Sequence, residues 1–227
     1  MPSLSQLLTS HGTLLVLDAA SMNVQVGLLR NSAPALWRST LGEAGTEIFT
    51  SAAALLREAQ LDVEAINALV FCEGPGSMLG IRTVAMALRT WQVLTPRPAF
   101  AYQSLALAAH FEWTQKPSRA FAVITDARRD TWHCQQIEAD GQMGPLQRIP
   151  GAALPGGEWM TPVNFRAWAQ PPRPTGSCSY ELAQILPTLA SGDFFHPVDA
   201  PDAFQHEVPD YKKWSAHIHS VATADKK

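Results

Sequence analysis

The 227-residue sequence has little of several features that define whole classes of protein. It has only three cysteines, Cys72, Cys134 and Cys178. Because they are odd in number and far apart in the sequence, they fit neither a disulfide framework nor a cysteine-ligated zinc site. No apolar run approaches the roughly 20 residues that a membrane-spanning helix needs. The first residues lack the basic start and apolar middle of a secretory signal. We therefore expect a cytoplasmic protein with reduced thiols and no membrane partner.

Charge is also sparse. Lys and Arg total 17 against 20 Asp and Glu, which gives a formal net charge of −3, and no long basic block occurs. A protein that binds nucleic acid by itself normally presents a basic face, so we do not expect strong direct binding of DNA or RNA. The 46% of hydrophobic residues indicates a folded core, large enough for one large domain or two small ones.

Hydrophobic periodicity predicts alternating strands and helices, the pattern of an α/β protein. Strands are expected at 13–18, 23–30, 35–41 and 66–72, and helices at 46–60, 81–93, 104–113 and 181–189. The segment 151–174 is rich in Pro, Gly and Trp and predicts irregular structure.

The opening strand pattern occurs twice. Leu14–Ala19 and Ala120–Ala127 are both apolar strands that end in Asp-Ala, and second strands follow them at 24–29 and 131–137. A single repeat over this separation predicts two similar half-domains rather than a solenoid.

The segment Gly74–Arg82 joins a predicted strand to a predicted helix, where backbone N–H groups can face a phosphate. Gly74 and Gly76 permit positive φ, and Ser77 is a natural N-cap. A Walker loop is excluded, because it needs four residues between its glycines and then Lys, whereas five residues separate Gly74 from Gly80 and Ile-Arg follows. A tight turn without a ligand stays open as the alternative.

Asp18 and Asp126 end the two repeated strands. In phosphotransfer folds of the actin and sugar-kinase type, an acid at this place orients a metal-bound phosphate. The turn after Asp18 is poor in the hydroxyl and glycine residues that let backbone approach phosphate, and two arginines follow Asp126. Either carboxylate could instead cap its own turn. The sequence has neither the Gly-x-Ser-x-Gly elbow of serine hydrolases nor the His-Glu-x-x-His helix of zinc proteases.

Read jointly, these motifs resemble the TsaB (YeaZ) family over most of the chain. The resemblance is carried by Leu14–Asp18, Gly74-Pro75-Gly76-Ser77-x-x-Gly80-x-Arg82, Ser104-Leu105, Ile124–Arg128 and Pro209-x-Tyr211. It implies an α/β, actin-like (ASKHA, RNase H-like) fold of two related lobes with mixed sheets. We expect the lobes at 1–99 and 100–204, with a segment at about 205–220 packing back on the first.

The resemblance also implies a role in forming N6-threonylcarbamoyladenosine at position 37 of tRNA. TsaB-like proteins are non-catalytic partners of the catalytic subunit TsaD, the ATPase TsaE joins the complex, and tRNA is contacted indirectly. The resemblance further implies a heterodimer with TsaD, a homodimer in isolation, and no required cofactor. We expect the partner face on the two helices around the glycine turn, at Ala52, Leu56, Arg82, Ala85 and Arg89.

The chain departs from the family pattern at Ala19, Gly45, Met78 and Leu79, changes that remove hydroxyls and a histidine from the would-be nucleotide cleft. These departures favour a scaffold over an enzyme. The alternative is an active nucleotide-dependent ATPase or kinase. It would bind ATP or ADP weakly with Mg²⁺ through two acids and the glycine turn, namely Asp18, Asp126, Gly74, Gly76, Ser77 and Gly80.

Overall fold

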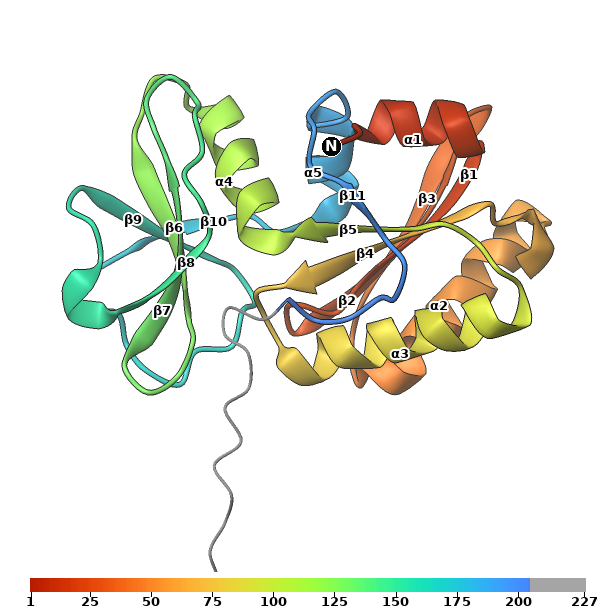
Figure 1. The fold of residues 1–227 in the computed structure, drawn as a ribbon, viewed down its shortest axis with the longest axis horizontal. Helices are drawn as coiled ribbons and strands as arrows, with labels where there is room; N and C mark the ends of the chain where they lie inside the picture. The colour runs from red at the N-terminus through yellow and green to blue at the C-terminus, as the bar shows by residue number, and fades with distance from the viewer. Residues whose placement is uncertain (205–227) are drawn as a thin grey trace, which may run out of the picture.

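Two mixed β-sheets organise the computed structural model, in which residues 1–204 are described (Figure 1). The first sheet has the order β11 (His196–Val198), β5 (Ala99–Gln103), β4 (Ala68–Gly74), β1 (Thr13–Asp18), β2 (Asn23–Arg30), β3 (Ala33–Leu41). The second has the order β10 (Gly176–Cys178), β9 (Glu158–Pro162), β6 (Phe121–Asp126), β7 (Thr131–Ile137), β8 (Gln147–Pro150). The segment expected at about 205–220, with its Pro209-x-Tyr211 match, lies outside the described residues.

Helices cover both faces of the first sheet. They are α1 (Leu4–His11), α2 (Ala44–Ala59), α3 (Met78–Leu94), α4 (Ser104–Gln115) and α5 (Leu182–Thr188), with short 3-10 helices η1 (Val63–Ala65) and η2 (Gly151–Ala153). Leu15 and Leu17 of β1 pack with α2 and α3, whereas Leu14 and Val16 pack with α1, α4 and α5. Burial on both faces explains why β1 is a continuous apolar run rather than an alternating one.

The two sheets repeat one topology. The order β3-β2-β1-β4-β5 corresponds to β8-β7-β6-β9-β10, with two antiparallel pairs and then two parallel pairs in each. Asp18 and Asp126 end the corresponding strands β1 and β6. The actin-like fold of two related lobes is thus confirmed, and Figure 1 shows the lobes to the right and left of the view.

The second repeat has connections without long helices. In the first repeat α2 joins β3 to β4, and α3 joins β4 to β5. The corresponding connections of the second contain only η2 and the segment 163–175, which has no helix among the described residues. The prediction of irregular structure at 151–174 is therefore right for most of that range, although β9 lies inside it.

The first sheet also takes strands from beyond the expected first lobe. β5 spans 99–103, so the boundary expected between 99 and 100 falls inside a strand of this sheet. β11, at 196–198, pairs antiparallel with β5. The sequence prediction omitted α1, β5, β8, β9, β10 and β11, each of which has three to eight residues. Among the described residues, no helix is both long and apolar enough to cross a membrane.

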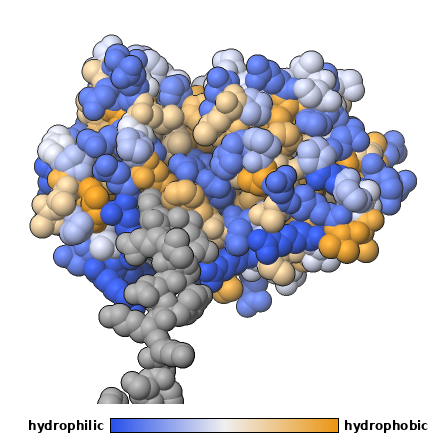
Figure 2. Space-filling model, in the orientation of Figure 1, coloured by the Kyte–Doolittle hydropathy of each residue, from blue (hydrophilic) through white to orange (hydrophobic). Residues whose placement is uncertain are grey.

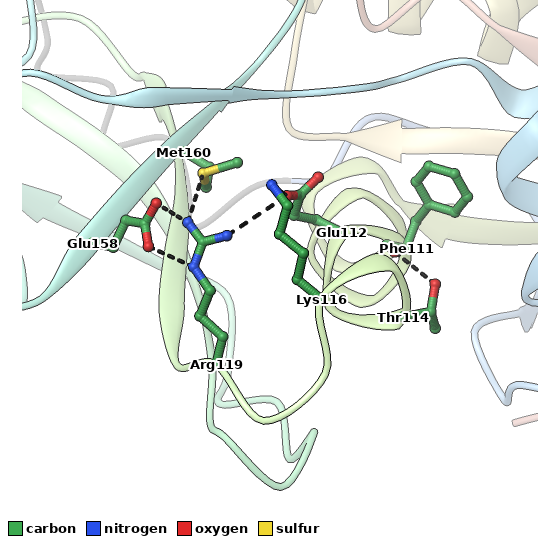
Figure 3. A network of polar contacts seen from close by, with 7 residues as sticks. All are labelled: Phe111, Glu112, Thr114, Lys116, Arg119, Glu158 and Met160. Atoms are coloured by element: carbon green, nitrogen blue, oxygen red, sulfur yellow. Dashed lines mark hydrogen bonds and ion pairs between the residues drawn. The ribbon is translucent and has the colours of Figure 1, made fainter.

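A polar network ties α4, which contacts both sheets, to the second one (Figure 3). Arg119 follows α4 and pairs with Glu158 at the start of β9, with Nε 2.6 Å from Oε2. Its Nη1 lies 4.0 Å from Glu112 of α4, whose carboxylate also accepts from Lys116 at 3.3 Å. The network fixes the end of α4 against β9.

Candidate functional site

Asp18 is the acid that a nucleotide-dependent enzyme of this fold would use, and it is completely buried. Its Oδ2 accepts hydrogen bonds of 2.7 Å from the hydroxyls of both Tyr102 and Tyr180, and its Oδ1 accepts one of 2.9 Å from the Ala20 N–H. Burial raises the pKa of the Asp18 carboxyl, an effect that these hydrogen bonds partly offset. Because Asp18 has no exposed surface, neither of its carboxylate oxygens is open to solvent.

The groups around Asp18 also join the two repeats. Tyr102 belongs to β5, whereas Tyr180 follows β10. Gln25 of β2 donates from Nε2 to the Tyr180 carbonyl at 2.9 Å and accepts from the Leu182 N–H at 2.8 Å. Residues of the first sheet are thus hydrogen-bonded to the segment after β10, and this bonding encloses Asp18.

A second set of bonds closes the turn after β1. The Met22 N–H donates to the Asn164 carbonyl at 2.7 Å, so the β1–β2 turn is bonded to the β9–β10 segment. The Ser77 N–H, at the start of α3, donates to the Ala20 carbonyl at 2.7 Å. These two backbone contacts place protein on both sides of the turn where phosphates would approach.

The glycine turn is built for this close backbone contact. A Cβ on Gly76 would lie 2.4 Å from the Ala20 carbonyl oxygen, and one on Gly80 would lie 2.2 Å from the Ala19 carbonyl oxygen. Gly74 has a φ of +124°, and Gly76 has one of +159°. The predicted N-cap is present, because the Ser77 Oγ accepts from the Gly80 N–H. The structure therefore packs the glycine turn directly against the turn after Asp18.

Asp126 caps its own turn and one more segment. Its Oδ1 accepts from the Arg128 N–H at 2.6 Å, in the same i to i+2 relation as Asp18 and Ala20. Its Oδ2 accepts from the N–H groups of Trp168 and Ala169, at 2.5 and 2.8 Å. Asp18 and Asp126 therefore each cap the turn that follows their strand, which is the alternative role considered for them from the sequence. Within residues 1–204, no group of three or more His, Cys, Asp or Glu side chains could hold a metal ion.

Two residues expected on the partner face lie in the core instead. Ala52 is 4% exposed and Ala85 is 2% exposed, because each shares its helical face with the large apolar residues that meet the sheet. Leu56 is half-buried, and Arg89 donates to the Pro201 carbonyl at 2.6 Å. Arg82 has an exposed side chain. Of the five predicted contacts, the two alanines are therefore wrong as surface residues.

The exposed side of α3 has an apolar stripe that the prediction missed. Leu79, Met86 and Val93 are 80%, 58% and 84% exposed and follow one another at intervals of seven residues. Seven residues are close to two helical turns, so the three side chains lie along one face. Phe49 of the neighbouring α2 is 44% exposed. Figure 2 shows apolar surface over the C-terminal part of α3, at the lower right. The seven-residue spacing is visible in the sequence and could have identified the stripe.

Comparison with known proteins supports the resemblance read from the motifs. A family model described as "TsaD: tRNA N6-adenosine threonylcarbamoyltransferase" matches residues 46–144. The search of curated proteins finds no match. The solved structure of YeaZ from Pseudomonas aeruginosa is 24% identical over 79% of this chain and 90% of that chain, with a TM-score of 0.60.

A second solved structure is that of a protein with similarity to peptidase YeaZ from Pseudomonas aeruginosa. It is 23% identical over 88% of this chain and 99% of that chain, with a TM-score of 0.61. Both solved structures share the two-lobed fold. Together with the TsaD-type match, they confirm the resemblance of this chain to the TsaB (YeaZ) family.

Proposed function

We propose that this chain is a non-catalytic, TsaB-like partner of a TsaD-type enzyme in the formation of N6-threonylcarbamoyladenosine at position 37 of tRNA. The similarity to YeaZ and the TsaD-type match at 46–144 support a place in this reaction. The proposal that the chain is non-catalytic is supported by the enclosure of Asp18, whose carboxylate accepts hydrogen bonds from two tyrosine hydroxyls and a backbone N–H.

Phosphoryl transfer on an actin-like scaffold needs an acid that reaches a metal ion or its water. Mg²⁺ binds carboxylate oxygens at about 2.1 Å and keeps several of its waters, so it needs open space beside the acid. Asp18 has no exposed surface, and the backbone of Ala20 and Ser77 is joined above its turn. No cofactor is required for the role that we propose.

The partner surface in this proposal is the exposed apolar stripe of α3, formed by Leu79, Met86 and Val93. Phe49 of α2, which is half exposed and packs on the Trp91 ring of α3, adds to the apolar surface of this pair of helices. Leu79, Met86 and Val93 are large exposed apolar side chains, separated along the helix by polar residues such as Arg82 and Thr90, and a partner that covers them gains the free energy of burying apolar surface. A stable interface buries on the order of 1,200–2,000 Å² in total, which two packed helices from each subunit can supply. We assign this surface to TsaD in the heterodimer and to a second copy in the homodimer, with TsaE and tRNA reached through TsaD.

The test is co-purification with the TsaD of the same organism, using Leu79→Glu combined with Met86→Glu. Burying each side chain contributes about 1.5–3 kcal/mol, so the double variant should lose at least 100-fold in affinity. Met143→Glu is the matched control, because Met143 is a partly exposed methionine of the second lobe. Both variants should melt near the wild-type temperature, since the substituted side chains lie at the surface.

Absence of a complex with the wild-type chain would refute the partner role. An unchanged complex with the double variant would refute the assigned surface. The modification assay with TsaD, TsaE and tRNA should depend on the chain. Titration of the isolated chain with ATP and Mg²⁺ should give no binding heat, and micromolar binding would instead support the alternative of an active ATPase or kinase.

A further inference from the structure

A separate surface lies at the end of the second lobe, where the β6–β7 turn and the β9–β10 segment run side by side (Figure 1). Two adjacent hollows there share Asp126 and Ala169. The open one, of about 340 Å³, is lined by Arg128, Arg129 and Trp168. The narrower one, of about 210 Å³, is lined by side chains that include Thr125, Thr161, Arg166 and Gln170.

This surface combines an exposed ring with unpaired cations. Trp168 is 67% exposed, and the Arg128 guanidinium carbon lies 5.0 Å from its ring centroid. Arg129 and Arg166 are exposed and have no ion-pair partner within residues 1–204. Residues 126–132 and 163–175 together hold four arginines and two aspartates, in a chain whose net charge is −3. The lower end of this lobe is among the most hydrophilic surfaces seen in Figure 2.

The surface is held in place rather than left to form on binding. Asp126 bonds the backbone of Arg128 on one side and that of Trp168 and Ala169 on the other. Arg128, Arg129 and Asp130 have φ values of 66°, 53° and 55°, an uncommon conformation for residues other than glycine. Such backbone is found preferentially at functional sites, where the surrounding structure holds it. The indole and the arginines therefore stand in a fixed relation to one another.

We propose that this surface binds a single-stranded RNA segment, with a base stacked on Trp168 and phosphates held by Arg128, Arg129 and Arg166. Aromatic side chains accept any base by stacking, and a positive groove beside them follows the backbone. The contact is local, which agrees with the low overall charge of the chain. It extends the proposed function, in which this chain has no RNA contact of its own, and it rests on that function only in taking tRNA as the source of the RNA.

The experiment measures fluorescence anisotropy of a labelled single-stranded RNA of about ten nucleotides with the full chain. Trp168→Ala should weaken binding by roughly 5-fold or more, whereas Trp168→Phe should retain most of it, because a ring remains for stacking. Changing both Arg128 and Arg129 to Gln should lower the slope of log K against log salt by about 1.4, since each phosphate contact on a single strand contributes about 0.7. Arg57→Gln, an exposed arginine of α2, is the charge-matched control and should leave binding unchanged.

Lack of binding by the folded wild-type chain would overturn the proposal, as would binding that survives both Trp168→Ala and the double arginine change. Equally tight binding of AMP would assign the surface to a free nucleotide instead, and equally tight binding of duplex RNA would exclude stacking. The proposed function is tested separately, through the α3 stripe and TsaD. A chain that forms the TsaD complex but binds no RNA refutes only the RNA surface, and the converse result refutes only the partner role.

Discussion

Replacing Gly80 by Ala tests whether the glycine turn exists for backbone contact. Gly80 lies inside α3, where Ala is favoured over Gly by about 1 kcal/mol through helix propensity alone. Against this gain, the new Cβ would lie 2.2 Å from the Ala19 carbonyl oxygen, whereas ordinary contact begins at 3.4 Å. The obstacle is backbone, which cannot rotate aside as a side chain could. The two turns would therefore have to separate by about 1 Å, an overpacking change that typically costs 1–3 kcal/mol.

Separation would also stretch the bond from the Ser77 N–H to the Ala20 carbonyl, now 2.7 Å, which contributes about 0.5–1.5 kcal/mol. The sum of these costs exceeds the helix gain, so we expect a net loss of about 2 kcal/mol in the free energy of unfolding. In a chain of this length, 1 kcal/mol shifts the melting temperature by roughly 2–4 °C. Gly80→Ala should therefore lower the melting temperature by about 4–8 °C.

Gly45→Ala is the matched control, because it makes the same chemical change near the start of α2. The nearest atom to its new Cβ is the Thr83 Cγ2 at 3.9 Å, an ordinary contact. Only helix propensity acts there, and the melting temperature should stay the same or rise by up to about 4 °C. Differential scanning calorimetry of both variants gives the comparison. A Gly80→Ala chain that melts at or above the wild-type temperature would show that α3 does not rest on the turn after β1.

Three further predictions concern buried and capping groups. Burial raises the pKa of Asp18, so the folded chain holds this proton more tightly than the unfolded one. The free energy of unfolding should therefore fall as pH rises above the ordinary carboxyl value of 3.8, and Asp18→Asn should remove that part of the slope in urea titrations; equal slopes would contradict it. The three cysteines are buried, with thiol pKa values raised to about 11 for Cys134 and about 12 for Cys178, so a disulfide reagent at pH 8 should label them only after unfolding. Asp126→Ala removes the acceptor of three backbone N–H groups, and should speed tryptic cleavage after Arg166 several-fold without abolishing the fold; cleavage at the wild-type rate would count against the capping role.

Local signals in the sequence predicted the two-lobed repeat and several strand bounds, whereas the actin-like fold itself was implied by the family resemblance. The repeated Asp-Ala strand ends predicted two lobes, and the apolar runs at 13–18, 23–30 and 131–137 are strands with those bounds. The N-terminal helix α1 was not predicted, because its eight residues are too few for a clear helical periodicity. Its capping box, formed by Ser3 and Gln6, is a local signal that could have identified it.

The site was harder to predict from the sequence, because the residues that contact one another in it are far apart along the chain. Tyr180 reaches Asp18 across 162 residues, and the Trp168 N–H reaches Asp126 across 42. Neither pairing leaves a local pattern. The misplaced alanines have a different cause: Ala is compatible with a helix face that meets the sheet and with one that meets a partner, whereas Leu79 and Met86 on the outer face indicate which side is free.

The segment between β9 and β10 links the enclosed acid to the proposed RNA surface. In the first repeat, the corresponding connection is α3, a helix that starts at the glycine turn. In the second repeat, the chain runs from 163 to 175 without a helix, and it contacts both acid turns. Asn164 accepts from Met22 beside Asp18, while Trp168 and Ala169 donate to Asp126. The same irregular segment therefore packs against the turn after the first acid and presents an exposed indole beside the second. A helix here would satisfy its own backbone N–H groups and leave fewer donors for Asp126, so the departure from the first repeat accounts for both features at once.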